Sequence, residues 1–98
     1  MPPSPSVEPI HDSLQDVEDE ASFLRFVALL VEDRRRAERL PLSADGHQGD
    51  WANQTIGAFL EAANAWAKDS QFGLRPGPKS GNPWRLFASF LWAGRGYE

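Results

Sequence analysis

The sequence contains no cysteine, and this absence removes several classes of function at once. A chain without thiols has neither a disulfide framework nor thiolate metal ligands, and thiol redox chemistry is excluded. Histidine is also scarce, because His11 and His47 are the only two and neither has a second histidine four residues away. We therefore expect no metal site and no cofactor.

Long apolar runs are missing as well. No stretch approaches the roughly 18 apolar residues of a membrane helix, and residues 1–15 lack the basic start and apolar centre of a signal peptide. These features predict a cytoplasmic protein without membrane contact. The formal net charge of −4 repels phosphate, so nucleic acid is a disfavoured partner and a basic protein is a favoured one.

What the sequence does have is an ordinary globular composition, with 41% hydrophobic residues in 98, which suits one domain with one core. The beginning of the chain differs, because prolines stand at positions 2, 3, 5 and 9 with little apolar side chain between them. Such a segment cannot bury enough surface to offset the entropy of ordering it. We predict a disordered Pro-rich tail over residues 1–14 and a single helical domain over residues 15–98.

Apolar side chains recur at spacings of three and four in three segments, which indicates amphipathic helices at about 19–38, 54–70 and 83–94. Asp19 is the predicted N-cap of the first helix, and either Asn53 or Thr55 begins the second. Asn82 followed by Pro83 is typical of a helix start, and Gly94 with Gly96 is expected to end the third helix in left-handed conformations. The predicted fold is all-α, a small three-helix domain in an orthogonal or bundle-like array.

Three blocks of the sequence resemble a family of small bacterial proteins known only as a domain of unknown function. The blocks are VEDEASFLRFV at 17–27, DWANQTIGAFLEAANAWAKD at 50–69 and NPWRLFASFLWAGRGYE at 82–98. The resemblance covers roughly residues 17–98 and implies a compact helical domain. It carries over no activity, cofactor or catalytic residue.

Tryptophan is unusually frequent, with four residues in the chain. Trp66, Trp84 and Trp92 fall on predicted helices and are expected in the core. Trp51 precedes a helix within a loop, beside Asn53, where an aromatic ring can act as a lid or as an anchor for a partner.

The sequence gives only weak indications of a set of catalytic side chains. Ser43, His47 and Asp45 or Asp50 can be combined on paper, but no glycine-flanked nucleophile turn is present, so loop polarity is the better interpretation. Glu61 alone is expected to look inward from its helix, and a contact with Arg85 near the start of the next helix would be structural.

Two basic segments of the sequence are candidates for anion binding. In the loop before Asn82, Arg75 and Lys79 stand among glycines, but Pro76 and Pro78 remove amide donors that a phosphate cradle needs. The other candidate is a stripe that could contact nucleic acid, made of Arg34, Arg35, Arg36, Arg39 and Arg95. Acidic neighbours favour a solvated helix end instead.

By elimination, the sequence predicts a noncatalytic protein-binding module, such as an adaptor or an immunity-like protein. Its candidate partner-binding residues are Trp51, Asn53, Glu61 and Arg85, and a homodimer through the helix at 83–94 stays open. The alternative is a small enzyme or ligand-binding domain with a site between the Asp50–Asn53 loop and the Gly-rich loop before Asn82. Convergence of the four candidate residues on one cavity would favour the alternative.

Overall fold

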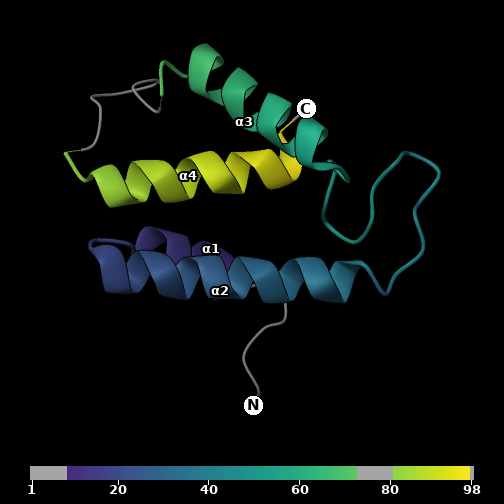
Figure 1. Ribbon diagram of the computed structural model, residues 1–98, viewed down its shortest axis with the longest axis horizontal. Coiled ribbons are helices and arrows are strands. Elements are labelled where there is room, and N and C mark those ends of the chain that lie inside the picture. The colour runs from purple at the N-terminus through teal and green to yellow at the C-terminus, as the bar shows by residue number, and fades with distance from the viewer. Residues whose placement is uncertain (1–8, 73–80, 98) are drawn as a thin grey trace.

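The computed structural model describes residues 9–72 and 81–97. These residues form four α-helices, α1 (Pro9–Gln15), α2 (Glu20–Ala37), α3 (Ile56–Asp69) and α4 (Pro83–Gly96) (Figure 1). Extended pairing in the described residues is limited to isolated bridges from Gln48 to Leu42 and to Trp51. The all-α class predicted from the sequence is confirmed.

The starts of the three longer helices are fixed by the caps that the sequence indicates. The side chain of Asp19 accepts a hydrogen bond from the Ser22 amide at 2.8 Å, and the Ser22 hydroxyl accepts one from the Asp19 amide at 3.0 Å, which closes a capping box. Thr55 caps α3, and Asn82 caps α4 with proline at the first helical position. Each cap satisfies backbone donors that would otherwise lack partners.

Helix α1 lies where the sequence predicted a disordered tail, so that prediction is wrong for residues 9–14. Ile10 and Leu14, one helical turn apart, are only 4% and 6% exposed, and α1 packs on both α2 and α4. Two apolar residues at a spacing of four are enough to anchor a helix of this length once other helices cover them. The rest of the predicted tail, residues 1–8, lies outside the described residues.

Helix α4 occupies the middle of the arrangement. It packs against α3 on one side and against α1 and α2 on the other, whereas α2 and α3 do not pack on each other (Figure 1). The α3 and α4 helices run antiparallel, as Figure 1 shows. The buried core lies mainly between α1, α2 and α4 and includes the following side chains: Ile10, Leu14, Val17, Phe26, Leu30, Ala37, Trp51 and Ala88.

The predicted role of Gly94 and Gly96 as left-handed helix stops is wrong. Helix α4 continues to Gly96, and positive φ among the described glycines occurs only at Gly46 and Gly49. Gly94 serves close packing instead, because a Cβ atom there would stand 2.7–2.9 Å from three atoms of the Phe59 ring. The missing side chain lets α3 approach α4 at this point.

Candidate functional site

A buried charge network holds the loop between α2 and α3 in place. The indole N–H of Trp51 donates to Asp33 Oδ2 at 2.8 Å, and Arg95 Nε donates to the same oxygen at 3.1 Å. A second nitrogen of Arg95 donates to Asp50 Oδ2, also at 3.1 Å, and its guanidinium lies 4.6 Å from the centre of the Trp92 ring. Loop, α2 and α4 are therefore joined through one guanidinium group.

This network changes two interpretations made from the sequence. Trp51 is 6% exposed, so its indole belongs to the core rather than to a lid or a free anchor. The expected core tryptophans Trp66, Trp84 and Trp92 are partly buried, and Trp84 and Trp92 pack against the buried core. Arg95 is 5% exposed and paired with carboxylates, so it cannot take part in the phosphate-contacting stripe considered above.

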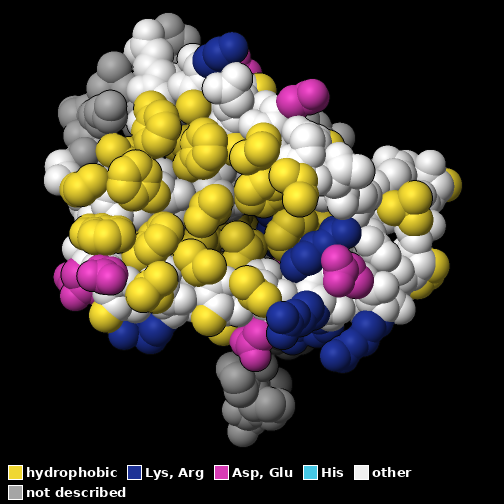
Figure 2. All heavy atoms as spheres, in the orientation of Figure 1, with side chains coloured by type: hydrophobic (Ala, Val, Ile, Leu, Met, Phe, Trp, Pro, Cys, Tyr) yellow, Lys and Arg dark blue, Asp and Glu magenta, His cyan; other side chains and the backbone are white. Residues whose placement is uncertain are grey.

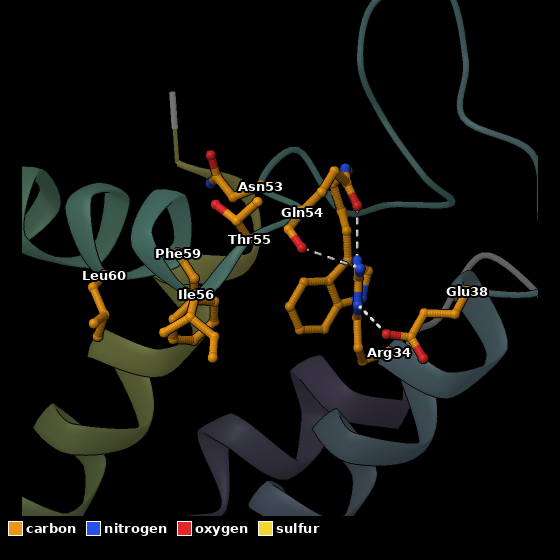
Figure 3. A pocket seen from close by; sticks show the side chains of 9 residues that line it. Arg34, Glu38, Asn53, Gln54, Thr55, Ile56, Phe59 and Leu60 are labelled. Carbon is orange, nitrogen blue, oxygen red and sulfur yellow. Dashed lines mark hydrogen bonds and ion pairs between the residues drawn. The ribbon is translucent and has the colours of Figure 1, made fainter.

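A second set of hydrogen bonds connects the segment before α3 to both neighbouring helices. Asn53 Nδ2 donates to the carbonyl oxygens of Gly94 and Tyr97 at 3.0 and 3.2 Å. Arg34 reaches from α2, donates to Gln54 Oε1 at 2.8 Å and pairs with Glu38 at 3.1 Å. Figure 3 shows these two contacts of Arg34 at the edge of an open groove.

The groove is lined by apolar side chains. Trp51 and Phe59 line its base, and their stacked rings have centroids 6.1 Å apart. Ile56, Phe59 and Leu60 line it from α3, as Figure 3 shows. Its volume is about 490 Å³. A neighbouring hollow of about 390 Å³ shares Arg34, Glu38, Trp51 and Phe59 with the groove and extends between α2 and α4.

Together the two hollows form one surface, which we call the apolar face. Its members are Val27, Leu30, Val31, Trp51, Ile56, Phe59, Leu60 and Leu91. Figure 2 shows hydrophobic side chains gathered across the helices on this side, with charged side chains only at the margins. Ile56 is 80% exposed, Leu60 53% and Val31 43%. Monomeric proteins rarely expose contiguous apolar surface of this kind without a function for it.

Polar side chains stand at the edge of the apolar face. Arg34 is bonded there to both Glu38 and Gln54, and the other polar lining residues are Arg35, Asn53 and Thr55. Such a composition suits binding, since desolvation of exposed aliphatic side chains favours association while fixed polar groups at the margin orient the partner.

The four predicted partner-binding residues are not brought together. Trp51 and Asn53 line the groove, whereas Glu61 is exposed and Arg85 lies at the other end of α4, where it donates to the Gln15 carbonyl at 2.8 Å. The expected Glu61–Arg85 contact is not formed, because α3 and α4 run antiparallel and their starts lie at opposite ends (Figure 1).

The Ser43, Asp45 and His47 side chains do meet in the loop, but not as a catalytic set. The Ser43 hydroxyl donates to the Asp45 carboxylate and accepts from the His47 amide at 3.1 Å. The bond from Ser43, with a further one from the His47 amide, lowers the pKa of the Asp45 carboxyl below its usual value of 3.8. Because the hydroxyl points at a carboxylate and not at an imidazole, these contacts stabilise a turn.

Three further expectations from the sequence concern a metal site, a membrane-spanning helix and a phosphate-binding loop. Within residues 9–72 and 81–97, no group of three His, Asp or Glu side chains could hold a metal ion. No helix of that part of the chain is long and apolar enough to cross a membrane. The proposed phosphate loop, including Arg75 and Lys79, lies outside the described residues.

Asp33 and Arg95 are the residues whose role the sequence analysis missed. A signal for them exists, because Asp33 follows buried Phe26 by seven residues and Arg95 follows buried Ala88 by seven. Seven residues are close to two helical turns, so each charge lies on the inner face of its helix. A charge on an inner face indicates a buried ion pair.

Comparison with known protein families matches residues 19–98 to a family of unknown function, DUF7660. The match begins at the N-cap of α2 and includes both sides of the groove. No curated protein and no solved structure gives a significant match.

Proposed function

The chain belongs to the DUF7660 family, and we propose that it is a noncatalytic protein-binding domain whose binding surface is the apolar face. The observation that carries the proposal is the exposure of Ile56, Leu60 and Val31 on helices around a groove. Burial of a fully exposed aliphatic side chain contributes about 1.5–3 kcal/mol, and Leu60 and Val31, which are about half exposed, would contribute about half of that each.

Hydrogen bonds and ion pairs that hold the groove in place also support a binding function. The base of the groove is held by the Asp33–Arg95 network, and its edge is held by the Arg34–Gln54 hydrogen bond. A surface fixed in this way loses little conformational freedom when a partner docks, which favours affinity. The net charge of −4 adds the prediction that a hetero-partner is basic. A cytoplasmic location and a bacterial origin stay predictions of the sequence.

The alternative, a ligand site between the Asp50–Asn53 loop and the loop before Asn82, is less well supported. Asn53 is bonded to the C-terminal end of α4, while Asn82 caps its N-terminal end. A helix of 14 residues spans about 20 Å, so the two loops do not approach each other at the described ends. The apolar hollows fall within the range of volumes seen for small ligands, and screening against them is the corresponding check.

Affinity capture with matched variants tests the proposed function. Leu60→Asp places a charge in the groove, and Leu42→Asp places one on a loop leucine that is 60% exposed and does not line it. We expect wild type and Leu42→Asp to capture the same protein and Leu60→Asp to lose it, with all three folded by circular dichroism. Equal capture by both variants would contradict the proposal, and so would a wild-type chain that binds neither another protein nor a second copy of itself.

A further inference from the structure

We propose that the apolar face binds a second copy of this chain, through antiparallel pairing of α2 with α2 of that copy. This inference rests on the proposed function and names the partner. It is carried by the pattern of apolar and charged side chains along one stripe of α2, which extends the apolar face along that helix.

The stripe consists of Glu20, Leu24, Val27, Val31 and Arg35. Successive members are four, three, four and four residues apart, so they follow one side of the helix. Leu24 is 55% exposed and Val31 43%, and the two end charges are exposed as well. The buried residues Phe26 and Leu30 lie about 100–160° around the helix from Leu24 and Val31, and Val27 is the member of the stripe that packs against the core.

Two copies of the stripe are complementary to each other when they run in opposite directions. The midpoint between Leu24 and Val31 falls between Val27 and Ala28, and the midpoint between Glu20 and Arg35 falls at the same place. A two-fold axis at this point would therefore set each Leu24 against Val31 of the second copy. The same axis sets each Glu20 against Arg35, which gives two ion pairs around an apolar centre.

The charges at the two ends of α2 favour the same antiparallel pairing. Its N-terminal turn follows Glu18 and Asp19, whereas its last turns carry Arg34, Arg35 and Arg36. Antiparallel packing brings the acidic end of one helix to the basic end of the other and also opposes their dipoles favourably. Parallel packing would place like charges together, so the charges select one orientation.

Partly exposed apolar residues of the other helices lie close enough in the fold to widen the contact. Val31 shares its hollow with Phe59 of α3 and Leu91 of α4, and Figure 2 shows the hydrophobic surface continuing across these helices. A stable dimer buries roughly 800 Å² on each partner, and one face of an 18-residue helix provides less than that. We therefore expect a dimer that dissociates on dilution.

Sedimentation equilibrium of the full chain, from about 1 µM to about 1 mM, tests the pairing. Glu20→Arg and Arg35→Glu each create like-charge contacts across the axis, and we expect each to weaken dimerisation about tenfold or more. An equimolar mixture of the two variants restores opposite charges at both contacts, so dimerisation should return in the mixture. The matched control is Glu32→Arg, which is exposed on α2 but about 120° around the helix from Glu20.

The possible outcomes separate this inference from the proposed function. A chain that stays monomeric throughout, or a dimer indifferent to the charge variants, overturns the pairing. If a monomeric chain captures a different protein through Leu60, only the identity of the partner is wrong. If neither self-association nor Leu60-dependent capture occurs, the proposed function fails too.

Discussion

Removing the Asp33 carboxylate is the most informative perturbation of the fold. Asp33 Oδ2 accepts hydrogen bonds from two groups that lie in the interior, the Trp51 indole at 2.8 Å and Arg95 Nε at 3.1 Å. Asp33→Ala leaves the indole N–H without this acceptor and leaves Arg95 beside Asp50, whose side chain is 75% exposed. The buried guanidinium then loses its contact with the mostly buried carboxylate and keeps the solvent-screened one of Asp50.

The expected loss can be estimated from these contacts. Breaking a buried ion pair by removing one member costs about 3–5 kcal/mol, because the other charge stays buried. Arg95 is 5% exposed and the Asp33 side chain 16%, but Arg95 keeps Asp50 and the Trp92 ring, so this range is the upper limit. Asp50→Ala, in contrast, removes an exposed partner and should cost at most about 1 kcal/mol. The whole domain is stabilised by about 5–15 kcal/mol, so Asp33→Ala removes a large part of the total.

Urea denaturation followed by circular dichroism measures both variants. Adding Arg95→Met to Asp33→Ala also removes the buried guanidinium charge. We therefore expect the double variant to be more stable than Asp33→Ala alone. If Asp33→Ala costs no more than Asp50→Ala, or if Arg95→Met makes it worse, the network does not hold the loop as described.

Three further perturbations test the packing and one surface bond. Gly94→Ala should lower the free energy of unfolding by about 1 kcal/mol, since crowding of the Phe59 ring (about 1–3 kcal/mol) outweighs the gain in helix propensity; a higher urea midpoint would refute this. Ile10→Ala should cost about 2 kcal/mol or more if α1 is anchored as described, and an unchanged midpoint would show that it is not. The bond from Tyr97 to Asp69 raises the pKa of the phenol above 10.0, so stability from it is present below that pH and is lost as the pH rises through the raised pKa. An absorbance titration of this single tyrosine should show a lower pKa in Asp69→Asn, and identical curves would exclude the bond.

The helices could be predicted from the sequence because their signals are local. Asp19 and Asn82 are caps that act within one turn, and the apolar spacing of α2, α3 and α4 needs no knowledge of neighbours. Helix α1 could not be found in this way, because Ile10 and Leu14 become an anchor only when α2 and α4 cover them. Its proline-rich surroundings favoured the wrong interpretation.

The candidate site depended on information that local patterns do not hold. Trp51 was a candidate from the sequence, yet its indole is bonded to Asp33, 18 residues earlier in the chain, which no local pattern indicates. Arg85 was grouped with it on the assumption that helix starts lie together, which the antiparallel course of α3 and α4 contradicts (Figure 1). The exposure of Ile56 and Leu60 results from the separation of α2 and α3, which only the tertiary arrangement shows.

If the apolar face is a protein-binding surface, a partner lies within reach of its exposed side chains, and site-specific photo-crosslinking in living cells detects that partner. A photoreactive side chain replaces Ile56, which is 80% exposed in the groove, or Leu42, which is 60% exposed in the loop and does not line the groove. We expect a discrete protein adduct from position 56 and none from position 42. Adducts from neither position, or the same adducts from both, would contradict it.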